Sequence, residues 1–149
     1  MLKLEINTKF IIMEFTQSTR TVRITRDDKP FRIQIPKMKV IGFTEFGSLE
    51  LEITENFTEI WNPLEQQAKE ASPYVSPWRS NIDEYKFRVK IDERTHIFDS
   101  KSELIWTSNF VNKYVTCIIE LKSVYDFKGF SGISCRVHQI KIHDSECLL

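Results

Sequence analysis

The sequence predicts a mainly β fold that carries one short helical segment. Several short runs alternate apolar with polar residues, and turn residues separate these runs. In one segment the apolar residues recur instead at the spacing of a helix. The chain has 149 residues, of which 41% are hydrophobic, so it is long enough to bury a core. We expect one domain over residues 1–143, followed by a short C-terminal tail at 144–149.

Alternating runs occur in both halves of the chain. Residues 27–30, Asp-Asp-Lys-Pro, are a turn signal, and a short hairpin is expected around Asp99 and Ser100. The apolar phase of the last run shifts near His138 and Gln139, which predicts a β-bulge there. The expected strands are 9–15, 20–26, 31–36, 48–54, 85–91, 114–127 and 132–143.

The helical segment is expected at 55–71. Apolar residues recur there at helical spacing, but Pro63 interrupts them, so the sequence is compatible with two short helices or with one kinked helix. A loop at 72–81 follows, in which Trp78 is expected to be exposed. Many short strands with one helical segment are typical of a small, partly open antiparallel barrel, for which the OB-fold is the natural candidate.

The charges are balanced overall but occur in blocks. The formal net charge is zero, which argues against a typical nucleic-acid binder. Between Arg20 and Lys39 there are seven basic and two acidic residues, a balance of +5, whereas between Glu45 and Glu70 there are seven acidic residues and one lysine, a balance of −6. Such blocks give a protein surfaces of opposite sign.

The sequence contains no recognisable catalytic constellation. Four glycines leave little room for a phosphate-binding loop, and no histidine has an adjacent serine or cysteine that spacing would single out. The ligand types in Cys135-x2-His138-x4-His143-x3-Cys147 suit zinc, but a continuous strand would place Cys135 and His138 on opposite faces. We therefore expect no enzymatic activity, no cofactor and no metal site.

The sequence also indicates a cellular setting. Its first residues lack the features of a signal peptide, and no apolar run approaches the roughly 20 residues that a membrane helix needs. We expect an intracellular protein without a membrane partner, in which Cys117, Cys135 and Cys147 are free thiols.

Basic and aromatic side chains share faces of the predicted strands. Alternation places Lys86, Arg88 and Lys90 on one face at intervals of about 7 Å, close to the phosphate spacing of an extended single strand. Aromatic rings stack on bases, and each such contact contributes about 1–3 kcal/mol. The candidate nucleic-acid-binding residues are Arg20, Arg23, Arg32, Trp78, Tyr85, Lys86, Arg88, Lys90, Trp106, Tyr125, Phe127 and Phe130. Loop residues with no expected role, suited to a matched control, are Arg79, Lys101 and Lys113.

Two parts of the chain resemble a viral family. The segments are PFRIQIPKMKVIGFTEFGSLELEI, and FRVKI followed by FDSKSELI and VTCIIELKSVYDFKGFSGISCRVHQIKI. Together they resemble the OB-fold single-stranded DNA-binding proteins of large nucleocytoplasmic DNA viruses, which are similar to the phage-type single-stranded DNA-binding proteins. The resemblance spans about residues 20–143 as scattered short motifs.

The resemblance implies roles for particular residues. Lys86, Arg88 and Lys90 would contact the DNA backbone, and bases would stack near Tyr125 and Phe127. Two departures from the family pattern are visible. The last strand lacks the tryptophan often found before the Q-x-K motif, and the tail DSECLL carries only two acidic residues where the phage-type proteins have a strongly acidic tail.

Two functions are compatible with these observations. The first is sequence-tolerant binding of single-stranded DNA in viral DNA replication or repair, by a protein of the host cytoplasm, viral factory or nucleus, or one packaged in the virion. The second is a protein–protein interaction or virion assembly module on the same fold, which the zero net charge favours. A continuous basic groove bordered by aromatics would favour DNA, and basic residues scattered among glutamates would favour the second function.

Assembly with other chains is a further expectation. Phage-type relatives often form dimers, and the tail ends in the apolar pair Leu148-Leu149. We expect a homodimer or a tail that docks on a neighbour, and we expect the tail to contact viral replication proteins.

Overall fold

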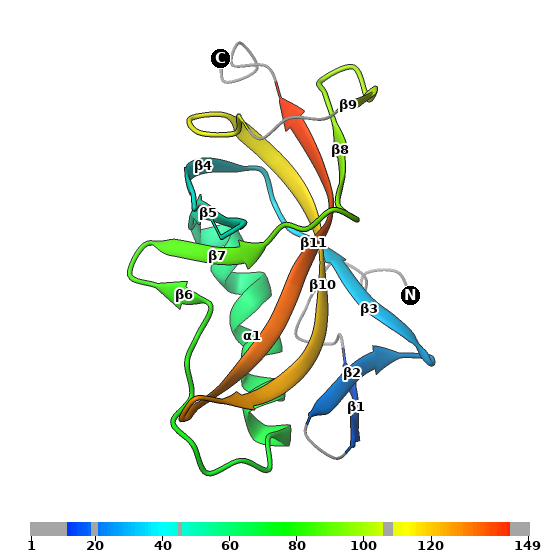
Figure 1. The fold of residues 1–149 in the computed structure, drawn as a ribbon, viewed down its shortest axis with the longest axis vertical. Coiled ribbons are helices and arrows are strands. Elements are labelled where there is room, and N and C mark those ends of the chain that lie inside the picture. The colour runs from blue at the N-terminus through cyan, green and yellow to red at the C-terminus, as the bar shows by residue number, and fades with distance from the viewer. Residues whose placement is uncertain (1–11, 19–20, 45, 106–108, 144–149) are drawn as a thin grey trace. The chain divides into compact units, whose positions relative to one another are not determined.

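The strands and the helix of this protein form an OB-like, mainly β fold, as the sequence predicts (Figure 1). The computed structural model describes residues 12–18, 21–44, 46–105 and 109–143. The elements are β1 (Glu14–Gln17), β2 (Val22–Arg26), β3 (Lys29–Gln34), β4 (Met38–Phe43), β5 (Ser48–Glu52), α1 (Glu55–Ala71), β6 (Ile82–Asp83), β7 (Lys86–Lys90), β8 (His96–Phe98), β9 (Leu104–Ile105), β10 (Tyr114–Phe127) and β11 (Phe130–His143).

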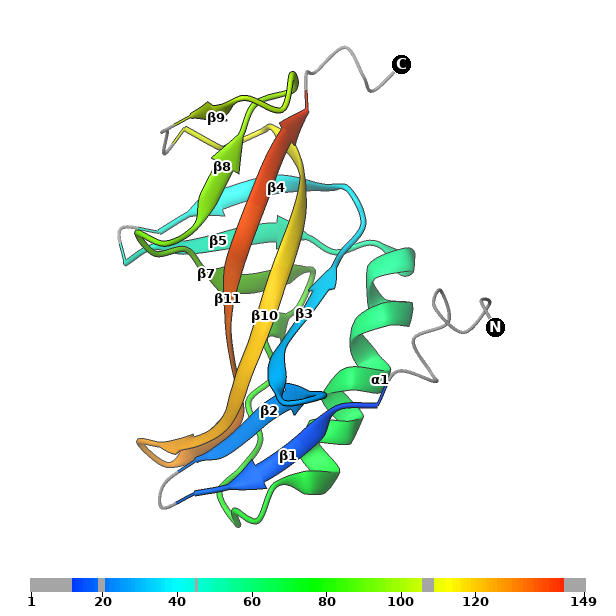
Figure 2. The same ribbon diagram turned by 90° about the vertical axis from the view of Figure 1, so that its right-hand side faces the viewer.

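The chain divides into two compact units. Unit 1 takes its residues from Met1–Phe31, Glu55–Asn81 and Leu121–Cys135, and unit 2 from Arg32–Thr54, Ile82–Glu120 and Arg136–Leu149. The two long strands β10 and β11 each contribute one part to unit 1 and the other part to unit 2 (Figure 2). That residues 1–143 behave as one domain stays a prediction.

Unit 1 combines a small antiparallel sheet with the helix. Strand β2 pairs with β1 on one side, from Gln17↔Val22 to Glu14↔Thr25, and also pairs with β3 and with β10. The side chains of β2 alternate as expected: Val22 and Ile24 are buried, and Arg23 between them is exposed.

A single helix, α1, occupies the whole of the segment expected to be helical. Pro63 lies inside it, where proline removes one backbone hydrogen bond and costs about 3 kcal/mol. Burial of Phe57, Trp61, Leu64 and Ala68, each with 0% of its surface exposed, offsets this cost. The helix α1 is not long and apolar enough to cross a membrane.

Unit 2 contains a partial ring of strands rather than a clear barrel. The pairing order is β10-β4-β5-β7-β11, and β10 and β11 also pair with each other. Strands β5 and β7 are antiparallel over five residue pairs, whereas β7 and β11 are parallel at Lys90↔Arg136. The β8–β9 hairpin, expected around Asp99, extends the order from β11.

Strand β4 was not expected from the sequence, and β1 begins later than expected. A register shift between Val40 and Gly42 interrupts the pairing of β4 with β5, so its residues do not alternate regularly. Strand β1 was expected at 9–15, of which 9–11 lie outside the described residues, and it begins at Glu14. Just before it, the Met13 N–H donates to the side chain of Gln67 on α1 at 3.0 Å.

The bounds of β10 are as predicted, and β11 begins two residues before its expected start. Lys128 and Gly129 form the two-residue turn between them, with φ of 51° and 86°. Residues Ile133 and Val137 are buried, and the buried phase then moves to Ile140, with His138 half-buried between them. This phase shift is confirmed, and the β-bulge inferred from it stays a prediction.

Candidate nucleic-acid interface

The end of the β10–β11 hairpin in unit 1 presents aromatic rings beside cations. Phe127 is 64% exposed, and the Nζ of Lys128 lies 5.2 Å from its ring centroid. Phe130 is 36% exposed, and the guanidinium carbon of Arg79 lies 3.9 Å from its ring centroid. Tyr125, half-buried on β10, lies close to this end. We call these five residues, Arg79, Tyr125, Phe127, Lys128 and Phe130, the tip cluster.

Local backbone geometry explains how the tip cluster forms. Lys128 adopts a left-handed conformation that L-residues other than glycine and asparagine adopt at a cost of about 1–2 kcal/mol. At Gly132, an added Cβ would lie 2.6 Å from the backbone oxygen of Arg79 and 2.8 Å from the Tyr125 hydroxyl. Glycine at this position therefore permits the close approach that brings Arg79 and Tyr125 to the hairpin.

Hydrogen bonds fasten the loop after α1 along the start of β11 (Figure 1). The Arg79 N–H donates to the Ser131 oxygen at 2.7 Å, and the Ser131 N–H donates to the Pro77 oxygen at 2.9 Å. The Ser76 hydroxyl donates to Asp126 at 2.8 Å. These bonds hold Arg79 against Phe130, a role that no sequence pattern indicated.

Trp78 is half-buried, not exposed as the sequence suggested. Its Nε1–H donates to Glu65 Oε2 at 3.1 Å. Glu65 also accepts hydrogen bonds from Trp61 at 2.7 Å and from Ser80 at 2.8 Å. Trp78 thus holds the loop against α1, and its indole N–H is already hydrogen-bonded to Glu65.

In unit 2, the side chains of β7 alternate as predicted. Phe87 and Val89 are buried, whereas Arg88 and Lys90 are exposed and Lys86 is half-buried. We call Lys86, Arg88 and Lys90 the β7 face. Tyr85, just before the strand, is 55% exposed, and the Nζ of Lys86 lies 5.9 Å from its ring centroid.

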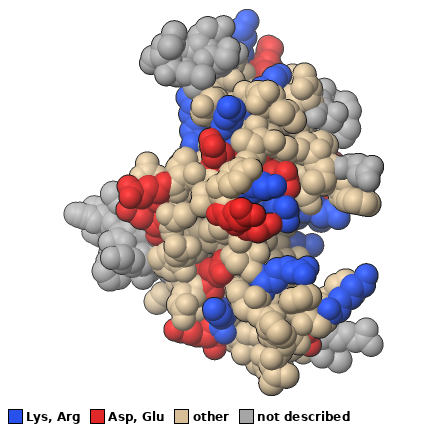
Figure 3. All heavy atoms as spheres, turned by 90° about the vertical axis from the view of Figure 1, so that its left-hand side faces the viewer, with Lys and Arg blue, Asp and Glu red and all other residues tan. Residues whose placement is uncertain are grey.

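Carboxylates interleave with the cations of the β7 face. The neighbouring strand β5 places Glu50 opposite Arg88 and Glu52 opposite Lys86. Arg88 forms ion pairs with Glu50 at 2.8 Å and with Asp83 at 3.5 Å. Figure 3 shows lysine and arginine side chains mixed with acidic ones on one face of the molecule. The β7 face is therefore not part of an uninterrupted basic groove among the residues described.

Arg32 belongs to an ion-pair network in unit 2. It contacts Glu120 at 3.1 Å, and Glu120 also contacts Arg136 at 3.6 Å. Arg136, almost fully buried, donates two hydrogen bonds to Asp92, at 3.0 and 3.1 Å. These hydrogen bonds, opposed by partial burial, hold the pKa of the Asp92 carboxyl well below its usual range. Sequence reasoning missed Arg136, because period-two alternation gives no sign of a carboxylate supplied by a distant segment.

Two histidines lie beside this network. The rings of His96 and His138 meet edge to face, with their centroids 6.0 Å apart. Burial lowers the pKa of His138 from its usual value, and the positive charges of Arg32 and Arg136 lower it further.

The predicted site residues are thus distributed over both units. The structure brings together Tyr125, Phe127 and Phe130 and adds Arg79 and Lys128, which the sequence analysis did not select. Unit 1 also contains Arg23, exposed on β2, and Trp78. Unit 2 contains Arg32, Tyr85, Lys86, Arg88 and Lys90. Outside the described residues lie Arg20, Trp106 and the tail 144–149.

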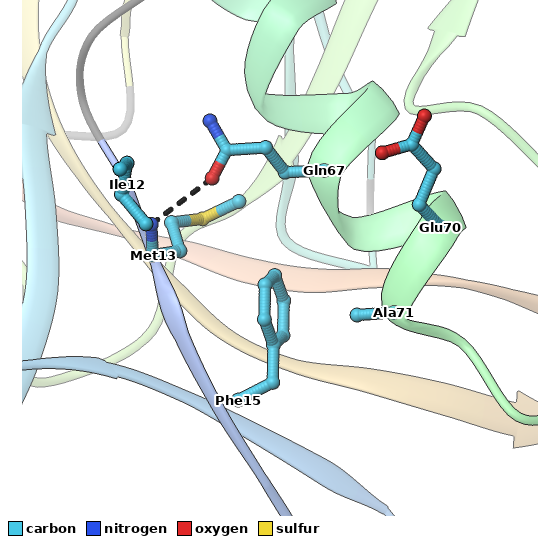
Figure 4. A pocket seen from close by; sticks show the side chains of 6 residues that line it. All are labelled: Ile12, Met13, Phe15, Gln67, Glu70 and Ala71. Carbon is cyan, nitrogen blue, oxygen red and sulfur yellow. Dashed lines mark hydrogen bonds between the residues drawn. The ribbon is translucent and has the colours of Figure 1, made fainter.

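A hollow of about 490 Å³ lies between β1 and α1 in unit 1 (Figure 4). Its lining is mostly apolar, and Glu70 is its one charged residue among the lining residues described. A carboxylate repels phosphate, so this hollow does not suit a nucleic-acid backbone. The residues that line it are Ile12, Met13, Phe15, Gln67, Glu70 and Ala71.

The cysteines of the described chain are not reactive groups. Burial raises the pKa of Cys117 and of Cys135 to about 12, so both thiols stay protonated near neutral pH. Within the described ranges, no three His, Cys, Asp or Glu side chains are grouped so that they could hold a metal ion.

The fold is similar to that of phage DNA-binding proteins. No protein-family model and no curated protein sequence matches this chain. The single-stranded DNA-binding protein from bacteriophage Enc34 matches with a TM-score of 0.57 and 10% identity, over 90% of each chain. Its C-terminally truncated form also matches with a TM-score of 0.57, at 9% identity, over 89% of this chain and 95% of that one.

A third solved structure shows the Enc34 protein in complex with single-stranded DNA. It matches with a TM-score of 0.53 and 10% identity, over 91% of this chain and 97% of that one. At these identities the likeness establishes a shared fold.

Proposed function

We propose that this protein binds single-stranded DNA and that bases stack on the tip cluster. The observation that carries the proposal is the pair of exposed rings, Phe127 and Phe130, each with a cation within 5.2 Å of its centroid. The similarity of the fold to that of single-stranded DNA-binding proteins supports it.

The chemistry of the tip cluster suits an unpaired strand. Every base has a π-face, and stacking on an aromatic ring contributes about 1–3 kcal/mol per base whatever the sequence. Arg79 and Lys128 supply positive charge for the neighbouring phosphates. Asp126, the acidic residue between Tyr125 and Phe127, already accepts a hydrogen bond from Ser76. The proposal therefore includes binding that tolerates any base sequence.

The β7 face has a secondary role in this proposal. Lys86 and Lys90 provide phosphate contacts, because their side chains lie, with that of Arg88, on the solvent-facing side of β7 at intervals of about 7 Å. Arg88 contributes less, since Glu50 and Asp83 already pair with its guanidinium.

The decisive test is the double variant Phe127→Ala/Phe130→Ala. Affinity for a fluorescent oligo-dT, measured by anisotropy at low salt, should fall at least tenfold, since two stacking contacts are each worth about 1–3 kcal/mol. The matched control is Phe46→Ala/Leu104→Ala, which removes two exposed apolar side chains of unit 2. Equal losses in both variants, or no binding by the unaltered protein even at low salt, would refute the proposal.

A protein–protein interaction module remains the second candidate. The observation that favours it is that Arg32 and Arg88 are both paired with glutamates, as expected if the basic strands do not form a DNA groove. Absence of oligo-dT binding together with an intact thermal unfolding transition would favour this function.

The biological setting forms a further part of the proposal. We infer a role in viral DNA replication or repair, an intracellular location, and assembly as a homodimer, on the basis of the motif resemblance at 30–53 and 87–142. A mass corresponding to a monomer in light scattering at tens of micromolar would contradict the dimer.

A further inference from the structure

A pair of histidines in unit 2 faces outward and has no part in the function proposed above. His96 on β8 is exposed, His138 on β11 is half-buried, and their ring centroids are 6.0 Å apart. A protonated imidazole donates two hydrogen bonds, and a neutral one donates a single bond. The pair can therefore present its largest number of donors to an anion when both rings are protonated.

The ion-pair network beside this pair carries more positive than negative charge. Glu120 is shared between Arg32, at 3.1 Å, and Arg136, at 3.6 Å, so one carboxylate faces two guanidinium groups. Asp92 is likewise shared, between Arg136 at 3.0 Å and Arg94 at 3.4 Å. Three arginines and two carboxylates leave this network with one excess positive charge before either histidine is protonated.

The charged groups that act on the pKa of His138 come from four strands. They are Arg32 on β3, Glu120 on β10, Arg136 on β11 and His96 on β8, and only Glu120 favours protonation of the imidazole. After burial, the two arginines are the main cause of the lowered pKa of His138. A bound anion would offset the field of these arginines and thereby favour the protonated ring.

We propose that His96 and His138, beside the ion-pair network of Arg32 and Arg136, form a phosphate-binding site that holds a backbone phosphate of the bound single strand. This inference rests on the proposed function and adds to it a third contact region, after the tip cluster and the β7 face, with its own regulation. Phosphate binding and histidine protonation favour each other, so affinity for DNA rises as the pH falls from 8 to 6.

The first experiment compares oligo-dT affinity at pH 8 and pH 6 at constant ionic strength. The unaltered protein should bind at least threefold more tightly at pH 6 than at pH 8. The reason is that the affinity for DNA can rise about tenfold for each unit by which bound DNA raises the pKa of His138. The double variant His96→Gln/His138→Gln should lose this dependence. The matched control His143→Gln, which replaces a histidine that contacts Thr116, should retain it.

The second experiment follows the imidazole protons of the unaltered protein by NMR and does not depend on the folding of any variant. Oligo-dT should raise the pKa of His138, and inorganic phosphate should do so at higher concentration. A change in the pKa of His138 with inorganic phosphate but not with oligo-dT would show that the ligand is free phosphate and not the DNA backbone. No change with either would show that the histidines do not form a phosphate site.

The two proposals fail in distinguishable ways. If the unaltered protein does not bind oligo-dT at either pH, the proposed function is wrong. If it binds equally well at both pH values, or if the histidine double variant keeps the full dependence, the function stands and the phosphate site is wrong.

Discussion

The tip cluster and the β7 face both contain exposed basic residues, but their neighbours make them different surfaces. At the tip, Arg79 and Lys128 lie against aromatic rings. On the β7 face, Arg88 lies between Glu50 and Asp83. A guanidinium that pairs with carboxylates must lose those contacts before it binds a phosphate, whereas a cation beside an aromatic ring keeps its charge available. The number of basic side chains on a face is therefore a poor guide to anion binding without the identity of the adjacent side chains.

Apart from the loss of both phenylalanine rings, the largest effect should come from Gly132→Ala, which tests the tip cluster through its backbone. The added Cβ would lie 2.6 Å from the Arg79 oxygen, so the loop must move away from β11. Overpacking of this kind costs about 1–3 kcal/mol of unfolding free energy, which thermal denaturation can measure. Oligo-dT affinity should fall several-fold as Arg79 leaves Phe130, and unchanged affinity would show that Arg79 need not lie on that ring.

The next-largest effect is expected from substitutions on the β7 face. The variant Lys86→Gln/Lys90→Gln should reduce the slope of log affinity against log salt by about 1.4, since each phosphate contact to a single strand contributes about 0.7. Arg88→Gln should change the slope less than either lysine does. The control is Lys101→Gln/Lys113→Gln, which removes the same charge from loops. Arg79, the third loop residue expected to have no role, is left out of the control because it belongs to the tip cluster. If test and control pairs lower the slope equally, the β7 face contributes only general charge.

The smallest effect is expected from Lys128→Asn, which should change stability and binding in opposite directions. Asparagine tolerates the left-handed conformation of this turn, so the free energy of unfolding should rise by about 0.5 kcal/mol. Loss of the cation beside Phe127 should lower oligo-dT affinity two- to threefold, corresponding to about 0.5 kcal/mol. Ser102→Asn relieves a similar backbone conformation in unit 2 without removing a charge. Equal binding losses in both variants would contradict the role of Lys128.

Local patterns predicted the parts of the fold that depend on neighbours along the chain. The alternation of 85–91 correctly placed Phe87 and Val89 in the core, because successive residues of a strand face opposite sides. The turn at Lys128-Gly129 lies between the expected strands 114–127 and 132–143, and glycine there permits positive φ. In α1, core burial kept one helix despite Pro63, which local propensity alone could not decide.

Features that depend on distant segments could not be predicted from the sequence. Glu50 reaches Arg88 only because β5 pairs with β7, and Asp92 reaches Arg136 across a separation of 44 residues. Arg79 was taken for an ordinary loop residue, because its contact with Phe130 depends on hydrogen bonds between the loop and Ser131. Candidate aromatic residues were easier to find, since Phe127 and Phe130 flank a recognisable turn.

The central claim is that bases of a single strand stack on the tip cluster, and photocross-linking tests it most directly. An oligo-dT in which 5-iododeoxyuridine replaces thymidine at single positions forms covalent bonds with aromatic side chains stacked on the modified base. After irradiation and proteolysis, mass spectrometry should find the nucleotide attached to Phe127 or Phe130, with Tyr125 as a lesser site. Efficient cross-linking at Tyr85 or elsewhere, with none between residues 125 and 130, would contradict the account.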